Sequence, residues 1–516
     1  MPSAIDLFCG AGGFSEGLLQ AGFDILFSSD KSSMVRDTYV NRHTQLGIRE
    51  GIDTHFELAD IRELTGEFVF DKINNLNLGE VYAIHDIDAI FGGPPCQGFS
   101  RAGKRDASDP RNMLFNEYLR LVSEIKPKYV VMENVVGILD MQMLDFPSVL
   151  STSEIYEGQN MVADILRTEL TGLGYKMLKP QVLNASDYGV PQQRKRVIFL
   201  AYRNDVAPLK YPEKGVDKFT VGDALSMLGT KENGSGPFAV ESVNGRTPSK
   251  KTKKAVKSKE IKNMELSTHS QTTTQRFSLY SFGENKTAVL SRLREEGINL
   301  LKSYPELFYE TLYQVNSTEN KKIIIEALEK LKLSKNINIT SLSLNHINKA
   351  LSSLSMLEKF DDNVNLGGLI KLMMKLKCNK NKAVLFWEEI KQKINPSISE
   401  ERLNRHLING EISDEIANAL FTKKGMRTRL DPDKPSPTII TLPDDFIHPY
   451  ENRILTVREM ARLQSFDDSF EFLGKRTTGG SMRAKEIPQF TQVGNAVPPL
   501  LANAIAKEVY QAIKSN

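Results

Sequence analysis

Short apolar runs alternate with amphipathic stretches over residues 1 to about 205, and this alternation leaves few folds open to the chain. Helical patterns such as Met113–Ile125 and Met161–Leu173 separate the apolar runs. The runs of strand length are Ala4–Leu7, Asp24–Phe27, Ala89–Phe91, Tyr129–Met132 and Val197–Ala201. Strands that alternate with helices build a mostly parallel sheet with helices on both faces. The predicted fold class is therefore α/β.

The pattern changes in the second half of the chain. Residues 249–259 hold six lysines and no acid, which fits either a solvated flexible loop or a loop that touches phosphates. Residues 285–420 carry Leu and Ile at helical spacing and predict a helical insertion with its own core. The C-terminal part predicts a strand over Thr438–Thr441, a helix with a capping box from Thr456 and an apolar helix over Leu500–Ile513.

Composition limits the classes of function. The 516 residues carry a net charge of +3 and a pI near 8.4, too mild to indicate nucleic-acid binding by itself. With three cysteines, neither a disulfide scaffold nor a cysteine-rich zinc site is expected, and no metal is predicted. We find no signal peptide and no apolar run of membrane-spanning length, which favours a soluble, cytoplasmic protein.

A rigid loop with a single cysteine follows the expected strand Ala89–Phe91, in the sequence GGPPCQGFS at residues 92–100. Its glycines let the backbone approach a ligand closely, and its prolines fix φ and remove two N–H donors. Such a loop can hold a thiolate still, whereas the alternative interpretation is a tight turn with a buried cysteine. Cys96 is therefore a candidate nucleophile.

Glycines also follow the first expected strand, in DLFCGAGGF at residues 6–14. A glycine-rich turn there is where an α/β sheet holds a nucleotide-like ligand, although this one lacks the dinucleotide fingerprint. Phe8 offers an aromatic face for an adenine, and Cys9 is interpreted as a packing residue. Asp30 ends the second strand, where a carboxylate either binds ribose hydroxyls or caps the next helix. Asp60 repeats this pattern after a further short run.

Three charged residues are expected near the same sheet edge. Glu133 follows the strand Tyr129–Met132, and α/β folds bind ligands at the carboxyl ends of parallel strands. A thiol beside a carboxyl that can protonate or hydrogen-bond a ring nitrogen suits attack on a pyrimidine. Arg194 and Arg196 are two apart and so share one strand face with Gln192. They either hold a base carbonyl and phosphates or form a charged strand entrance.

Five segments resemble, in sequence and in order, the motifs of the DNA (cytosine-5) methyltransferases, and most closely those of prokaryotic restriction–modification systems. They are residues 6–14, 92–100, 133–135, 192–196 and 494–499. The resemblance implies a Rossmann-like, S-adenosylmethionine-dependent fold with a discontinuous catalytic domain, 1–210 and 456–516. A target-recognition region would begin at 211–284, contain the helical insertion at 285–420 and end at 421–455.

The resemblance also assigns roles to the catalytic candidates. Cys96 would add to C6 of cytosine, and Glu133 would engage N3 and the exocyclic amine. Arg196 would hold the base O2, with Arg194 supporting the site. Adding a thiolate at C6 breaks aromaticity and makes C5 nucleophilic, and the base must first flip out of the duplex.

Further residues are implied to hold the cofactor S-adenosylmethionine. Asp30 would take the ribose hydroxyls, and Asp60 with Ile61 the adenine. The family often has a second acid two positions after the residue that matches Asp30, where this chain has Ser32. The other implied contacts are Phe8, Gly10, Gly12, Gly13, Pro94, Leu114 and Asn495.

The implied function is transfer of a methyl group to C5 of cytosine in a specific double-stranded DNA sequence, as the modification arm of a restriction–modification system. A cognate endonuclease would be a functional partner, a monomer is the default expectation, and DNA binding implies association with the nucleoid. Two alternatives remain open here. One is the same chemistry on tRNA, although more than 200 residues between the last two motifs favour a DNA-groove reader. The other is a non-catalytic DNA-binding protein with this fold.

Overall fold

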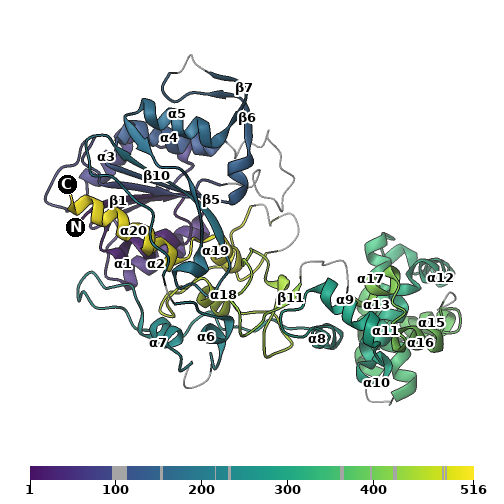
Figure 1. Cartoon of the computed structure of the whole chain (residues 1–516). Helices are drawn as coiled ribbons and strands as arrows, with labels where there is room; N and C mark the ends of the chain where they lie inside the picture. Colours follow the sequence, from purple (N-terminus) through teal and green to yellow (C-terminus); the bar gives the residue numbers. More distant parts are fainter. Residues whose placement is uncertain are drawn as a thin grey trace. The chain divides into compact units, whose positions relative to one another are not determined.

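The computed structural model places the chain in two compact units (Figure 1). The first unit comprises Met1–Leu266, Asp431–Pro443 and Leu455–Asn516, and the second Ser267–Leu430 and Asp444–Ile454. The structure describes residues 1–95, 113–151, 155–215, 217–229, 234–360, 365–394, 398–421, 427–478, 482 and 485–516.

An eight-stranded sheet forms the centre of the first unit, in the order β3-β2-β1-β4-β5-β10-β8, with β9 also paired to β10. The five strands from β3 to β5 run parallel, while β10 is antiparallel to β5 and to its other neighbours. The predicted mostly parallel sheet is confirmed. The strands are β1 Ser3–Leu7, β2 Asp24–Asp30, β3 His55–Leu58, β4 Ala89–Gly92, β5 Tyr129–Asn134, β8 Tyr175–Met177, β9 Gln181–Asn184 and β10 Lys195–Arg203.

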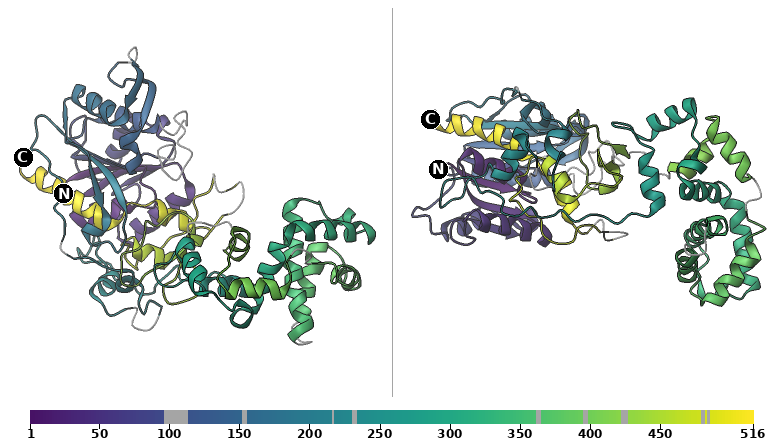
Figure 2. Two further views of the ribbon diagram at one scale, coloured as in Figure 1. Left: turned by 45° about the vertical axis from the view of Figure 1, so that its right-hand side comes forward. Right: turned by 90° about the horizontal axis from the view of Figure 1, so that it is seen from below.

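Helices cover both faces of this sheet (Figure 1 and Figure 2). One core contains the apolar sides of α3 Gly66–Asn74, α4 Leu114–Ile125 and α5 Val162–Gly172. The opposite core contains α1 Gly13–Ala21 and α20 Pro499–Lys514. A β-carbon on Gly17 of α1 would lie 2.5 Å from that of Ala502, so these two helices pack almost backbone to backbone. The end of the chain thus completes the domain that its beginning starts.

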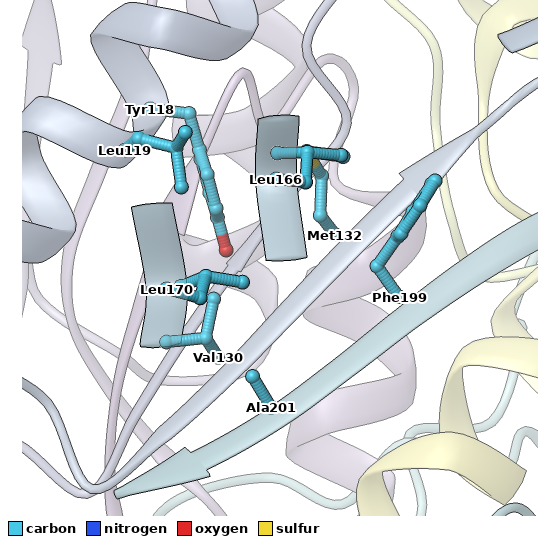
Figure 3. A pocket seen from close by; sticks show the side chains of 8 residues that line it. All are labelled: Tyr118, Leu119, Val130, Met132, Leu166, Leu170, Phe199 and Ala201. Atoms are coloured by element: carbon cyan, nitrogen blue, oxygen red, sulfur yellow. The ribbon is translucent and has the colours of Figure 1, made fainter. Parts of the chain in front are cut away.

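A small void remains in the core between the sheet and helices α4 and α5 (Figure 3). The hydroxyl of Tyr118 donates to the carbonyls of Ile90 and Val131, so it does not offer a free polar group there. We interpret the void as a packing gap and not as a ligand site. Its lining is Tyr118, Leu119, Val130, Met132, Leu166, Leu170, Phe199 and Ala201.

Buried ion pairs tie the C-terminal part of the first unit to its N-terminal part. Arg42 pairs with Glu16 at 2.8 Å and lies 3.8 Å from Asp467, and Arg246 pairs with Asp467 at 3.0 Å. The other elements of this unit are α2 Ser33–Gln45, η1 Ile61–Glu63, η3 Val136–Asp140, β6 Gln142–Pro147, β7 Ile155–Met161, η4 Ala185–Tyr188, α6 Val221–Leu225, α7 Pro237–Asn244, α18 Val457–Leu463 and α19 Gln489–Asn495.

The lysine-rich loop 249–259 packs at the amino end of β2. Lys250 Nζ lies 3.8 Å from Asp24 and 3.5 Å from Asp53, and its N–H donates to the carbonyl of Leu46. This anchor is at the opposite end of the strand from Asp30. Contact of the loop with phosphates stays a prediction, and such contact would not take place at the carboxyl edge of the sheet.

The second unit is helical and contains two hydrophobic cores. One core joins α8, α9, α11, α16 and α17, and the other joins α12, α13, α14 and α15. Two short strands, β11 Thr428–Arg429 and β12 Phe446–Ile447, pair in this unit, and η6 Pro443–Asp445 lies where the chain passes between units. The helices are α8 Gln271–Ser278, α9 Lys286–Glu296, α10 Leu300–Ser303, α11 Pro305–Val315, α12 Ser317–Lys330, η5 Ser334–Asn336, α13 Ser341–Phe360, α14 Asn365–Leu376, α15 Lys380–Ile390, α16 Glu400–Ile408 and α17 Asp414–Phe421.

The strand predicted over Thr438–Thr441 does not form. Ile439 instead gives its N–H to the side chain of Gln192, and its carbonyl accepts from Arg194. The segment is therefore held by side chains and not by a neighbouring strand. Within the described residues no helix is long and apolar enough to cross a membrane.

Candidate active site at the carboxyl edge of the sheet

An ion pair between two neighbouring strands marks the edge. Arg196 Nε of β10 lies 2.7 Å from Glu133 Oε1 of β5, and each side chain is 12% exposed. The pair forms because β10 runs antiparallel to β5 with Ile198 opposite Glu133. A carboxylate and a guanidinium so placed can orient one another and still reach a ligand.

The loop that leads to Cys96 begins directly beside this pair. A β-carbon on Gly93 would lie 3.2 Å from Glu133 Oε2, so the absence of a side chain lets the loop pass the carboxylate. The carbonyl of the buried Pro94 accepts a hydrogen bond of 3.2 Å from Asn134 Nδ2 at the end of β5. These contacts fix the entry to the cysteine loop at the Glu133 carboxylate. Cys96 itself lies outside the described residues.

The side chain of Arg194 does not lie beside that of Arg196, so the prediction that the two share one strand face is wrong. Its guanidinium is 1% exposed and donates to the carbonyls of Ile439, at 2.9 Å, and Gly494, at 3.0 Å. Strand β10 begins only at Lys195, so strand alternation does not extend back to Arg194. Arg194 thus positions backbone near the site, and its side chain is not available to a base or a phosphate.

The glycine-rich loop at the end of β1 has the form of a ligand cradle. Phe8, Gly10 and Gly12 all have positive φ, and a β-carbon on Gly10 would meet nothing within 4 Å. A β-carbon on Gly13 would lie 2.2 Å from the carbonyl oxygen of Val497, so the segment before α20 passes close to the loop. Asn495, at the end of α19, is exposed.

Asp30 fixes this loop from the neighbouring strand. Its Oδ2 accepts from the N–H of Gly10 at 3.2 Å and its Oδ1 from the N–H of Ser32 at 2.9 Å. Ser32 is the N-cap of α2, so Asp30 holds the helix start as well as the loop. Burial raises the pKa of Asp30. A carboxylate held between loop and helix can still accept from ribose hydroxyls through its remaining lone pairs.

Asp6 is a buried acid under the same loop, and no role is predicted for it from the sequence. Ser15 Oγ donates to Asp6 Oδ2 at 2.6 Å, while Oδ1 has no partner among the described residues. Burial raises the pKa of Asp6 to about 7. The sequence did contain a signal for this residue, because an acidic residue inside a strand that is expected to be buried indicates a special role. An unpartnered carboxylate oxygen beside a glycine cradle fits a ligand with polar or positive groups.

The remaining candidates have simpler surroundings. Asp60 pairs with Arg62 at 2.7 Å, and this hydrogen-bonded arginine lowers the pKa of Asp60 to about 2. Ile61 and Leu114 are buried in the core that contains α4. Cys9 packs in a cluster with Tyr39 and Phe56, and burial raises the pKa of its thiol, so it behaves as a packing residue. No metal-binding group of His, Cys, Asp or Glu occurs in the described part of the chain.

The mostly parallel sheet, the glycine cradle and the Arg196–Glu133 ion pair at one edge define an α/β enzyme with a nucleotide-like cofactor site. The chain belongs to the C-5 cytosine-specific DNA methylase family, whose model matches residues 3–511. It is therefore a DNA (cytosine-5) methyltransferase that uses S-adenosylmethionine. The family match confirms the resemblance and favours DNA over tRNA as substrate.

Several similar proteins agree with this assignment. Type II methyltransferase M.DdeI of Desulfomicrobium norvegicum is 28% identical over 514 residues, 98% of this chain and 88% of that protein. Type II methyltransferase M1.HphI of Haemophilus parahaemolyticus is 30% identical, over 98% and 86% of the two chains. A prophage-encoded E. coli protein, described as a DNA modification methyltransferase, has the same fold with a TM-score of 0.56, 21% identity and full coverage of both chains.

Proposed function

We propose that this enzyme methylates one cytosine within a specific double-stranded DNA sequence, by a covalent mechanism with Cys96 as the nucleophile. The observation that carries the proposal is the Arg196–Glu133 pair, which lies beside the loop that leads to Cys96. A flipped cytosine at this edge would meet a carboxyl, a guanidinium and a thiol together.

Each group has a distinct task in the proposed mechanism. The Cys96 thiolate adds to C6 while Glu133 hydrogen-bonds N3 and the exocyclic amine, which makes the ring a better electrophile. Arg196 holds O2 and keeps the Glu133 carboxylate oriented through the 2.7 Å contact. Bound S-adenosylmethionine supplies an electrophilic methyl group. Loss of the C5 proton then restores aromaticity and expels Cys96.

The cradle at the end of β1 fits the cofactor. Phe8 would lie against the adenine, and the open face of Gly10 allows close approach to the backbone. Asp30 would accept from the ribose hydroxyls. The unpartnered Asp6 Oδ1 supports a ligand with a polar group under the loop. Further proposed contacts are Gly12, Gly13, Asp60, Ile61, Pro94, Leu114 and Asn495.

The biological role we propose is host-DNA protection in a type II restriction–modification system. The names of M.DdeI and M1.HphI support this role, because both similar proteins are type II methyltransferases. A cognate endonuclease would act on the same sequence as a functional partner, and this role does not require physical contact. One flipped base needs one catalytic domain, so we propose a monomer.

The domain assignment is also a proposal. Residues 1–210 and 456–516 would form the catalytic domain, and 211–284 with 421–455 the target-recognition region around the helical insertion 285–420. The separate helical insertion is supported by the second unit, Ser267–Leu430 with Asp444–Ile454, which has its own cores, whereas residues 211–266 belong to the first unit.

Bisulfite sequencing of DNA from cells that express the protein tests the proposal. We expect protected cytosines at one short recurrent sequence, absent with Cys96→Ala and unchanged with Cys378→Ala. Cys378 is a matched control because it is a free thiol of the helical unit and belongs to none of the five motif segments. Equal protection by Cys96→Ala would refute the assigned nucleophile, and no protection by a well-expressed unchanged protein would refute DNA methylation.

A further inference from the structure

The bundle of α12, α13, α14 and α15 is strongly basic, although the whole chain is nearly neutral. Residues 317–394 contain fourteen lysines, no arginine and eight acidic residues, a net charge of +6 against +3 for the entire protein. This positive charge is not spread evenly. The stretch 371–382 alone holds five lysines and no acid.

These five lysines form a corner where α14 ends and α15 begins, and all are exposed. None takes part in an ion pair within the described part of the chain. The acids of α15 are engaged elsewhere, since Glu388 pairs with Lys391 and Glu389 with Lys330 and Lys393. The lysine corner, defined as Lys371, Lys375, Lys377, Lys380 and Lys382, therefore has no acidic partner among the described residues.

The helices that carry the corner are fixed by a core. Leu376 of α14 and Phe386 of α15 are fully buried in it. Asn379 caps α15, its Oδ1 accepting from the N–H of Lys382 at 3.0 Å. The lysines thus project from a defined surface. Lys371 and Lys375 stand at i and i+4, a like-charge pairing that destabilises a helix unless an anion relieves it.

We propose that the lysine corner binds the phosphate backbone of the DNA outside the methylated sequence. This inference rests on the proposed function, which supplies a polyanionic partner. Lysine acts on phosphate as a point charge, whereas planar arginine is suited to bidentate readout of bases. A surface of lysines without arginine therefore favours contacts that position DNA and do not specify its sequence.

Fluorescence anisotropy with the full-length protein tests the inference. The probes are fluorescein-labelled duplexes of about 12 and about 40 base pairs, centred on the sequence found by bisulfite sequencing. The triple variant Lys375→Gln, Lys377→Gln, Lys380→Gln is compared with Lys330→Gln, Lys391→Gln, Lys393→Gln. The control removes the same charge from paired lysines of the same bundle.

We expect the corner variant to bind the long duplex about tenfold more weakly, with a salt slope lower by about 2 to 3. Its binding to the short duplex, and both affinities of the control variant, should match the unchanged protein. Equal slopes for the two variants on the long duplex would overturn the inference and direct the search to an acidic protein surface. If the unchanged protein methylates DNA in that case, the proposed function stands and only the corner assignment fails.

Discussion

Two arginines that stand two positions apart in the chain have different environments. Arg194 is buried and holds the carbonyls of Ile439 and Gly494, whereas Arg196 faces the Glu133 carboxylate. A buried guanidinium that joins separate segments supports the fold, because its removal leaves two carbonyl groups without their hydrogen-bond donor. An arginine in a partly open ion pair can serve chemistry instead.

These environments predict opposite effects for the same substitution. Arg194→Lys should lower the free energy of unfolding by about 3 kcal/mol, since one ammonium cannot span both carbonyls. Arg196→Lys should leave stability within about 1 kcal/mol and reduce kcat for methyl transfer at least tenfold, because the Nε contact that orients Glu133 is lost. Urea unfolding and steady-state kinetics separate the two. Similar effects of both variants on both quantities would contradict the assignment.

Asp6 predicts a pH dependence of stability. Its folded pKa of about 7 lies above the usual value of 3.8, so the folded protein retains a proton that the unfolded chain releases. The stability contributed by this proton is present below pH 4 and is lost as the pH rises to about 7. Asp6→Asn should remove this pH-dependent loss of stability, so at pH 8 its free energy of unfolding should exceed that of the unchanged protein by about 1 kcal/mol or more. Urea titrations at pH 5 and pH 8 measure it.

Asp60 supplies the contrast for this experiment. Its arginine partner lowers its pKa to about 2, so its contribution to stability is present above pH 4 and disappears only on acidification. Asp60→Asn should therefore change stability equally at pH 5 and pH 8. A pH-independent Asp6→Asn effect across the same range would show that Asp6 ionises normally.

At the scale of elements, the contact of α1 with α20 carries a prediction that opposes helix propensity. Gly17→Ala would gain about 1 kcal/mol from propensity alone. The added methyl would, however, lie 2.5 Å from both the Ala502 β-carbon and the Asn503 nitrogen. We expect a net loss of about 1 to 3 kcal/mol in thermal or urea unfolding. Ala502→Gly in the same protein should restore only part of it, since the Asn503 backbone remains.

Sequence patterns predicted the strands that pair with other long strands of the central sheet. The five expected strands occur as β1, β2, β4, β5 and β10, because strands that are buried on both faces of a sheet, whether parallel or antiparallel, have continuous apolar sequences. The short strands β3, β8 and β9 carry too few residues for a period to emerge. The false strand at Thr438–Thr441 contains the buried Ile439, but the partners of this residue are the side chains of Gln192 and Arg194. No local pattern encodes partners more than 240 residues away.

The candidate site was predictable to a similar extent. Motifs located Glu133, Arg196 and the glycine cradle, because Glu133 and the cradle lie where β5 and β1 end, and Arg196 lies where the antiparallel β10 begins at the same sheet edge. The inward turn of Arg194 depends on where β10 begins, and the burial of Asp6 depends on packing around it. Spacing alone determines neither of these features.

For the whole molecule, separate cores predict separate unfolding. Leu351 is fully buried in the core of α12 to α15, and Leu18 in the core beneath α20. Calorimetry should resolve more than one transition. Leu351→Ala should lower the midpoint temperature of one transition, which corresponds to a loss of about 2 to 5 kcal/mol in the free energy of unfolding of that core. It should leave the affinity for S-adenosylmethionine unchanged. Leu18→Ala should lower a different transition, and coincident shifts would indicate a single cooperative structure.

The placement of α20 against α1 has a consequence for synthesis on the ribosome. Residues 1–266 emerge early, but the face of the sheet around α1 stays uncovered until residues after 455 follow. This apolar surface of the nascent chain stays exposed while the helical unit, which lies between residues 266 and 455 in the sequence, is translated. That unit, with cores of its own, can fold first. Modification activity would thus begin only after translation of the last helix, so incomplete chains could not methylate DNA.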